Sequence, residues 1–412
     1  MVIKGFEKAN FMSRSKYRSA LPLDFLSGVL NRDLKLIFVS TLIGAFGDGL
    51  YYWMLPLYVR ALGAGPVEVG IVFSIQYLTA AFTLILGGLL ADKYDRKKVI
   101  ILGWLVWLPV PIIFSLATNW IQLLPGAVLY GFWIGQPAFS AYIATSADKQ
   151  KMMLTFAIIS SSWSFGYFFS PALGGYISTV IGMRWVFCLA FLFYASCTCG
   201  LFFISSQRVR TQFSGLSLST ALVKRKKIIV WSIFFAVIMF FMFLIRPSVP
   251  QILRDEYNLS EFRIGVLGSI TFLGSAPLGI ILGRIGDRWK KAGAISFCMV
   301  LSCVSIATLV SFNNFFTLSL ACFLLGASFT TWSLVGAVVG SFAPETLRAR
   351  WISFPLSASM LAAFLAPYLG GLLYESWPYN PFLVFITATL VLSVLALARI
   401  FEEEAEENRV EG

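Results

Sequence analysis

The chain has 412 residues, of which 58% are hydrophobic and only 13% are charged. Because soluble domains carry about 25% charged residues and disordered chains are poor in apolar ones, this composition excludes both classes. Histidine, the commonest metal ligand and proton shuttle, does not occur, and the six cysteines lie in apolar stretches without metal-ligand spacing. We therefore expect a membrane protein without a metal ion or cofactor, in which the position of the charges must explain the net charge of +12.

Charge-free runs of about 20 residues, the length of a helix that crosses a bilayer, follow one another along the chain. Polar breaks divide the two longest runs, and Asp48 and Arg246 each interrupt one run. The twelve predicted spans are Leu36–Val59, Val69–Ala91, two within Val99–Ala147, Met152–Met183, Trp185–Gln207, Ile228–Leu253, Ile264–Gly283, two within Ala292–Pro344, Trp351–Tyr374 and Ser376–Ala398. The sequence thus predicts an all-α polytopic membrane protein with twelve transmembrane helices.

Nearly all Lys and Arg residues lie in the two tails and in the even-numbered loops between these spans. The odd-numbered loops hold only Arg60, Arg184, Arg254 and Arg263. Because loops rich in Lys and Arg stay in the cytoplasm, we expect both termini to be cytoplasmic and the protein to lie in the plasma membrane. The basic charge is then a signal of topology in the lipid bilayer, and no nucleic-acid partner is expected.

The two halves of the chain repeat each other. The run Gly88–Lys98 after the second span is similar to Gly283–Lys291 after the eighth, and their aspartates, Asp92 and Asp287, are 195 residues apart. The same offset separates Gly70 from Gly265. The predicted organisation is a cytoplasmic N-terminal tail (1–33), a six-helix bundle (34–207), a cytoplasmic linker (208–227), a second six-helix bundle (228–401) and an acidic cytoplasmic tail (402–412).

This organisation resembles the major facilitator superfamily over nearly the whole chain. The family's loop signature after span 2, G-x-L-A-D-R-x-G-R-K, is matched at Gly88, Leu90, Ala91, Asp92, Arg96 and Lys97. Lys93 replaces an Arg conservatively, and Asp95 replaces the second Gly but still permits a turn. The resemblance implies two pseudo-symmetric bundles that rock about a central site, as in a secondary transporter working by alternating access.

The loop signature is a candidate gate. In the family the aspartate contacts the start of span 11, where it closes the cytoplasmic side of the outward-facing state. The alternative is a basic loop that only sets topology. The predicted gating residues are Gly88, Asp92, Arg96 and Lys97, the repeat pair Asp287 and Arg288, and Arg348 and Arg350 at the start of span 11.

Asp48 lies near the middle of the first span, where a carboxylate costs about 2.5–3.5 kcal/mol on insertion scales. We interpret it as a substrate contact or a protonation site, with a structural hydrogen-bond acceptor as the alternative. Arg246 lies within the seventh span before Pro247 and corresponds in the repeat to Tyr51. Asp48 and Arg246 are therefore predicted to approach each other across a central cavity, unless Arg246 extends to the interface.

Six further polar or aromatic residues are weaker candidates for the cavity. They are Tyr51, Tyr52, Gln76, Gln136, Trp163 and Trp332. With 39 Phe, 15 Tyr and 12 Trp in the chain, most aromatic residues are expected simply to pack or to face lipid.

Small residues and prolines recur in the fifth and eleventh spans, where they allow close packing and bending. They are Gly166, Pro171, Gly174 and Gly175 in the fifth span, and Pro367, Gly370 and Gly371 in the eleventh. The fifth-span pattern resembles the family's antiporter motif, which is associated with export. The Arg of the family's proton-linked motif is missing near Gly131, so proton coupling is in doubt unless Asp48 carries it.

Motifs of enzymes, including phosphate-binding loops, are missing, so we expect a transporter and not an enzyme. The aromatic residues and the span-5 motif favour export of a small lipophilic molecule by a monomer, coupled to a proton or another ion. Uptake of a sugar or organic anion, with Arg246 as the anion contact, is the alternative. A non-transporting membrane receptor is a remote third interpretation. The sequence does not choose the substrate, the direction or the coupling ion.

Overall fold

The structure is a computed structural model that describes residues 29–148, 151–208, 218–288, 291–342 and 348–411. Within these ranges every regular element is a helix. Helix starts follow ordinary capping chemistry: the Asn31 side chain accepts from the Leu34 amide at 2.9 Å, and Glu68 accepts from the Gly65 amide at 2.8 Å. Prolines interrupt several spans, as at Pro109 and Pro367, because proline removes a helical hydrogen bond.

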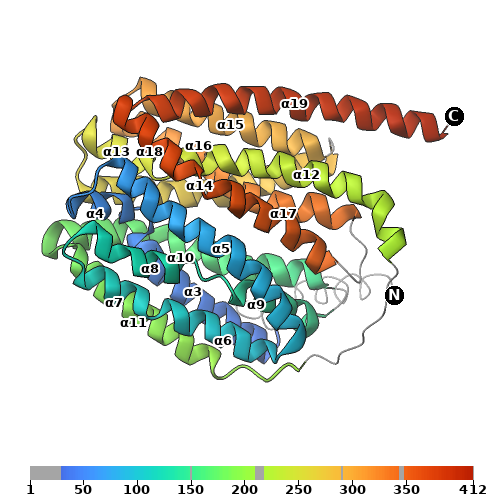
Figure 1. The fold of residues 1–412 in the computed structure, drawn as a ribbon, viewed down its shortest axis with the longest axis horizontal. Coiled ribbons are helices and arrows are strands. Elements are labelled where there is room, and N and C mark those ends of the chain that lie inside the picture. Colours follow the sequence, from blue (N-terminus) through green and yellow to red (C-terminus); the bar gives the residue numbers. More distant parts are fainter. Residues whose placement is uncertain (1–28, 149–150, 209–217, 289–290, 343–347, 412) are drawn as a thin grey trace, which may run out of the picture.

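The first half of the chain forms one bundle, drawn blue to green in Figure 1. Its helices are α3 (Arg32–Tyr52), α4 (Leu55–Ala61), α5 (Pro66–Lys93), α6 (Arg96–Trp107), α7 (Pro109–Leu116), η2 (Trp120–Leu123), α8 (Leu124–Tyr130), α9 (Gly135–Ser146), α10 (Met152–Ile181) and α11 (Met183–Leu201). The second half forms the other bundle, drawn yellow-green to red. Its helices are α12 (Leu218–Ile245), α13 (Ser248–Asp255), α14 (Glu261–Arg288), α15 (Lys291–Ser311), α16 (Phe315–Phe342), α17 (Arg348–Ala363), α18 (Ala366–Ser376) and α19 (Asn380–Glu411).

Nine of the predicted spans correspond to stretches of helix that are long and apolar enough to cross a membrane, within the described residues. The other three correspond to α8 with α9, to α10 and to α16. Two helices extend further than the predicted boundaries: α12 begins at Leu218, within the predicted linker 208–227, and α19 continues to Glu411 through the predicted tail. Lys, Arg and Glu favour helix, so charged ends of these helices continue them.

The repeat in the sequence is also a repeat in space. A Cβ atom at Gly70 of α5 would lie 2.3 Å from the Pro367 carbonyl oxygen of α18, and one at Gly265 of α14 would lie 2.3 Å from that of Pro171 in α10. Likewise, a Cβ atom at Gly371 would lie 2.4 Å from the Pro66 carbonyl oxygen, and one at Gly175 would lie 2.4 Å from that of Glu261. The bundles therefore meet along two equivalent seams, α5 with α18 and α10 with α14, where glycine lets the backbones touch.

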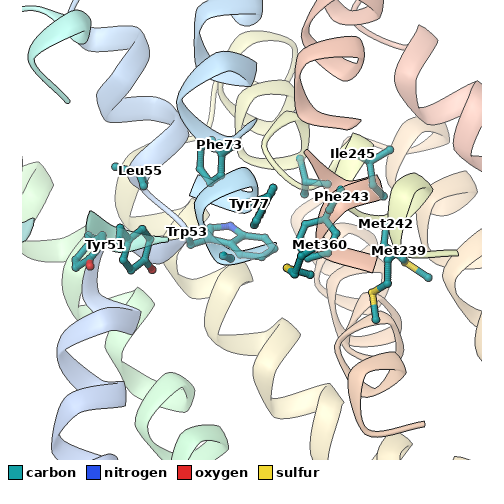
Figure 2. Close-up of a cluster of buried hydrophobic side chains, with 14 of the residues drawn as sticks. Tyr51, Trp53, Leu55, Phe73, Tyr77, Met239, Met242, Phe243, Ile245 and Met360 are labelled. Atoms are coloured by element: carbon teal, nitrogen blue, oxygen red, sulfur yellow. The ribbon is translucent and has the colours of Figure 1, made fainter. Parts of the chain in front are cut away.

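Buried apolar side chains fill the middle of the interface between the bundles. Figure 2 shows Trp53 and Tyr77 of the first bundle beside Phe243 and Met360 of the second. The Tyr77 and Phe243 ring centroids are 4.3 Å apart, and Trp53 lies where a Cβ at Gly268 of α14 would be. These aromatic contacts lie between the two ends of the interface.

Candidate functional site

One end of the interface, the end formed by α4, α13 and α18, is closed. Arg60 of α4 pairs with Asp255 of α13 at 3.7 Å and donates to Gln251 Oε1 at 3.4 Å. The Tyr374 hydroxyl donates a hydrogen bond to Asp255 Oδ2 at 3.0 Å. Arg60 and Asp255 are themselves 195 residues apart, so this ion pair joins equivalent positions of the repeat. We refer to this region as the closed end.

Further along the same end, α10 and α14 are joined by polar contacts. Ser178 donates to the Glu261 carboxylate, and the Ala172 amide donates to Ser269 Oγ at 3.1 Å. Together with the contacts of Arg60, these hydrogen bonds hold the two bundles together at this end and near the middle.

The opposite end, which carries the repeated loop motif after α5 and α14, has no such packing at its glycines. A Cβ atom at Gly88 or at Gly283 would meet nothing within 4 Å. These two glycines are therefore not used for close packing against the described residues of the other bundle in this conformation. We refer to this region as the open end.

A cavity of about 500 Å³ lies between the bundles on the side of the open end. It follows α14 from Phe272 to Gly283, about 16 Å of helix at 1.5 Å per residue. Its lining residues are Trp163, Ser164, Tyr167, Phe272, Ser275, Ala276, Gly279, Ile280, Gly283, Phe329 and Thr330. The inner part is therefore aromatic, while small and hydroxyl side chains occupy the outer part.

Asp48 is buried beside the inner end of this cavity, in the first bundle. The Tyr130 and Tyr194 hydroxyls both donate to Asp48 Oδ1 at 2.6 Å, and the Tyr167 hydroxyl donates to Oδ2. Tyr51, which is fully buried, contacts the Tyr194 hydroxyl at 2.7 Å. Four helices, α3, α8, α10 and α11, thus converge on one carboxyl group whose two oxygens are both hydrogen-bonded.

Tyr167 connects this cluster to the cavity, because it contacts Asp48 and also lines the cavity wall. Its ring is stacked 6.1 Å from Trp163, which is stacked 6.4 Å from Trp104 behind it. On its other side it packs 4.6 Å from Phe272 of the second bundle. A ligand in the cavity would therefore touch the residue that holds the buried carboxyl group.

Arg246 lies in the break between α12 and α13, half-buried among aromatic rings. Its guanidinium carbon is 4.3 Å from the Phe243 centroid, 4.8 Å from Phe329 and 6.0 Å from Tyr52. The Tyr77 hydroxyl lies within hydrogen-bonding reach. Phe329 also lines the cavity, so Arg246 lies directly behind the inner wall.

Asp48 and Arg246 are not in direct contact. The ion pair between Arg60 and Asp255 involves neither of them. The ring of Tyr52 lies between the two buried charges, 5.6 Å from the Tyr167 ring and 6.0 Å from the guanidinium of Arg246. Both carboxylate oxygens of Asp48 accept hydrogen bonds from tyrosine hydroxyls, and Asp48 does not approach Arg246 as predicted. Any coupling between the two charges would pass through this aromatic layer.

The remaining predicted cavity residues are dispersed. Trp163 lines the cavity, and Tyr52 lies between the two charges. Gln76 is buried in α5, whereas Gln136 at the start of α9 is exposed. The side chain of Trp332 lies outside the described residues.

The loop motif after α5 organises the open end of the first bundle. Arg96 donates to the Ala141 carbonyl at 3.1 Å and to Gln207 Oε1 at 2.8 Å, and so links the start of α6 to α9 and to the segment after α11. Asp95 accepts from Ser206 and from the Gln207 and Lys97 amides. Partial burial would raise the pKa of Asp95, but these hydrogen bonds lower it overall.

Asp92, at the end of α5, is exposed and interacts electrostatically with Arg96. The side chains of its predicted partners at the start of span 11, Arg348 and Arg350, lie outside the described residues, and so do those of the predicted repeat pair Asp287 and Arg288. The gating contact between Asp92 of α5 and the start of α17 thus stays a prediction.

The predicted packing motif gives close helix contacts. A Cβ atom at Gly166 would lie 2.6 Å from Ala45 Cβ, and one at Gly174 would lie 1.7 Å from the Leu50 carbonyl oxygen, both in α3. Gly370 is the equivalent of Gly174, with the Leu244 carbonyl oxygen at 2.2 Å. Pro171 lies inside α10.

Sequence reasoning missed the residues that complete the site. Tyr130, Tyr167 and Tyr194 surround Asp48, and Phe272 and Phe329 form the inner cavity wall. The available signal was weak: each tyrosine places a hydroxyl in a charge-free run, where a buried polar atom needs a partner.

Comparison with known proteins agrees with this architecture. The model of the Major Facilitator Superfamily matches residues 37–245 and 231–412. The chain is 26% identical to the multidrug resistance protein MdtG of Proteus mirabilis over 72% of this chain and 77% of that protein. It is 24% identical to a multi-drug resistance efflux pump PmrA homolog of Lactococcus lactis, over 86% of this chain and 92% of that protein.

Solved transporter structures share the fold. A nucleoside transporter, NupG, superposes with a TM-score of 0.72 and 16% identity over 89% of this chain and 99% of its own. A POT family transporter in complex with 5-aminolevulinic acid gives 0.73 and 14% identity, over 89% and 96%. The human organic anion transporter MFSD10 gives 0.68 and 14%, over 89% and 99%. With its two repeated helical bundles, the cavity between them and a family match over most of its length, the chain belongs to the major facilitator superfamily of membrane transporters, which are not enzymes.

Proposed function

We propose that this protein is a secondary active transporter that exports small lipophilic organic compounds by alternating access. The observation that carries the proposal is the cavity of about 500 Å³ between two bundles whose glycines are tightly packed at one end of the interface and unpacked at the other. With both termini in the cytoplasm, as the Lys and Arg distribution predicts, the open end faces the cytoplasm. The conformation is then the one that loads a cytoplasmic substrate.

The character of the cavity supports a lipophilic substrate. Its volume lies within the range of about 300–1,000 Å³ typical of small-molecule sites, and its inner wall is aromatic. Between the bundles, Met239, Met242 and Met360 belong to the buried apolar cluster of Figure 2. Flexible thioether side chains adapt to ligands of different shape. Resemblance to relatives named multidrug resistance proteins supports the same substrate class.

Asp48 is the proposed coupling residue. It is the acidic group next to the cavity, and Tyr167 forms the contact between the two. A ligand that displaces the Tyr167 ring would change the hydrogen bonding of the carboxyl group, and a proton on Asp48 would change how Tyr167 is held. This mutual dependence is what ion-coupled transport requires.

Transport by the purified protein in proteoliposomes tests the proposal. A fluorescent lipophilic dye should move away from the side that bears the open end, faster when a proton gradient is applied. Asp48→Asn should remove the acceleration by the gradient, whereas Asp95→Asn, a carboxylate outside the cavity, should keep it. Dye fluxes equal to those of protein-free liposomes would contradict the proposed function.

Uptake of an organic anion is the second candidate, and Arg246 is the observation that favours it. The direction of the flux relative to the orientation of the protein separates the two. Net movement toward the side of the open end would favour uptake.

A further inference from the structure

The guanidinium of Arg246 has an unusual environment for a charge inside a membrane protein. Its neighbours are the rings of Phe243, Phe329 and Tyr52 and the hydroxyl of Tyr77. Aromatic faces attract a cation, but they leave most of the five N–H donors of an arginine without an acceptor. Buried charges in membrane helices normally pair with a group of opposite charge.

No carboxylate of the described residues supplies that opposite charge. The nearest acidic group of the site, Asp48, accepts hydrogen bonds from three tyrosine hydroxyls and makes no ion pair with Arg246. Gln251, one turn beyond Arg246, is directed elsewhere, since its side chain contacts Arg60 and the Pro247 carbonyl. The described residues therefore leave the positive charge of Arg246 unneutralised in this conformation.

The position of Arg246 makes it reachable from the cavity. Phe329 lies 4.8 Å from the guanidinium and also forms part of the cavity wall. Tyr52 of the first bundle, whose ring lies 6.0 Å from the guanidinium, packs edge-on against Phe272 of the same wall at 5.9 Å. A ligand whose apolar part lies on Trp163 and Phe272 would place its far end beside these two rings.

We propose that the transported compound carries an anionic group, a carboxylate, sulfonate or phosphonate, that pairs with Arg246 at the inner end of the cavity. The planar guanidinium binds such groups with two parallel hydrogen bonds, a geometry that lysine cannot reproduce. The apolar remainder of the compound lies on the aromatic wall. The substrate class is thus an amphipathic organic anion, and this assignment rests on the proposed function of the cavity as a transport site.

Binding to the purified protein tests the proposal without any transport step. The probes are three compounds of one shape: 1-naphthaleneacetate, its neutral carboxamide and the corresponding 2-(1-naphthyl)ethylamine. Quenching of tryptophan fluorescence reports binding, because Trp163 lines the cavity. The wild type should bind the carboxylate about ten- to a hundredfold more tightly than the carboxamide, the range expected for a charge-assisted hydrogen-bonded pair, and should bind the amine most weakly.

The variants identify the residue responsible. Arg246→Gln should bind the carboxylate no better than the carboxamide, and Arg246→Lys should keep only part of the preference. Arg263→Gln is the matched control, because Arg263 also lies over an aromatic ring, Phe315, but outside the cavity. It should bind all three probes as the wild type does.

Equal affinity of the wild type for carboxylate and carboxamide would overturn the proposal, and this comparison remains decisive if Arg246→Gln does not fold. A preference that survives in a folded Arg246→Gln variant would overturn it as well. The two proposals fail separately: transport of neutral and cationic dyes without a preference for anions would leave export standing and refute anion recognition. Selective binding of anions without any flux would leave anion recognition at Arg246 standing and refute export.

Discussion

The two ends of the bundle interface are built from the same repeated sequence but are packed differently. At the closed end, Gly175 and Gly371 lie where a Cβ would be 2.4 Å from a carbonyl oxygen of the other bundle. At the open end, Gly88 and Gly283 have no atom within 4 Å of the equivalent position. Glycines at both ends thus permit close backbone contact, but only one end uses it in this conformation. The difference indicates that the open end has an unused surface for closure, as alternating access requires.

A bulky side chain in place of a glycine at either end of the bundle interface should hold the transport cycle in one conformation. This is the largest effect that we expect. Gly175→Leu cannot keep the closed end closed, and Gly88→Leu fits the present conformation but blocks closure of the open end. Each should lower transport at least about tenfold, which corresponds to about 1.4 kcal/mol.

Labelling of single cysteines separates the two variants. Gly175→Leu should expose closed-end positions such as Ser178, and Gly88→Leu should protect them. Gel filtration controls for folding. Wild-type transport by both variants would show that the glycines do not serve closure.

The tyrosine cluster around Asp48 lies within the first bundle and should stay intact while the ends move. Asp48→Ala would leave three buried hydroxyls without their acceptor, each at a cost of about 1–3 kcal/mol. Asp48→Asn keeps an acceptor oxygen and should lose less. Thermal unfolding in detergent should rank the melting temperatures as wild type, Asp48→Asn, Asp48→Ala. A tie between the two variants would mean that the cluster is not tightly packed.

Asp92 tests whether the open end closes through its loop motif. Asp92→Asn should leave the present conformation folded and weaken the other one, since a carboxylate near a helix start contributes about 0.3–1 kcal/mol. Transport should fall about two- to fivefold, while the melting temperature stays within about 2 °C of the wild type. Unchanged transport, with unchanged labelling of open-end cysteines, would reduce the motif to a topology signal.

The Arg60–Asp255 pair should have the smallest effect, because both side chains are about one-third exposed. Exposed ion pairs contribute about 0.2–1 kcal/mol, so Arg60→Gln or Asp255→Asn should favour opening of the closed end by at most about fivefold. The pair joins equivalent positions of the repeat, so the exchanged variant Arg60→Asp with Asp255→Arg should recover closure. The accessibility of a cysteine at Glu256 measures this equilibrium. An exchanged variant more open than either single one would show that the pair does not hold the end.

The sequence allowed much of this architecture to be predicted, because charge-free runs and a repeat offset follow directly from the physics of a bilayer. It also identified Asp48 and Arg246, since a charge within an apolar span is costly. It did not reveal their neighbours: Tyr130, Tyr167 and Tyr194 are distant in sequence and meet only after the helices pack.

Two other features lay beyond sequence reasoning for different reasons. The equivalence of Arg60 and Asp255 is present in the 195-residue offset, but a residue at a span end gives no sign that its partner lies across the interface. The conformation also cannot be predicted from the sequence, because the sequence of a transporter must stabilise the conformations closed at either end to a similar extent.

Paired distance measurements by spin labels test alternating access most directly. One pair, Ala61 with Glu256, reports the closed end, and another, Tyr94 with Arg284, reports the open end; all four residues are exposed. Substrate and a proton gradient should lengthen the Ala61–Glu256 distance and shorten the Tyr94–Arg284 distance in the same population of molecules. Distances that change together, or that do not change in a protein that transports, would contradict alternating access between the two ends.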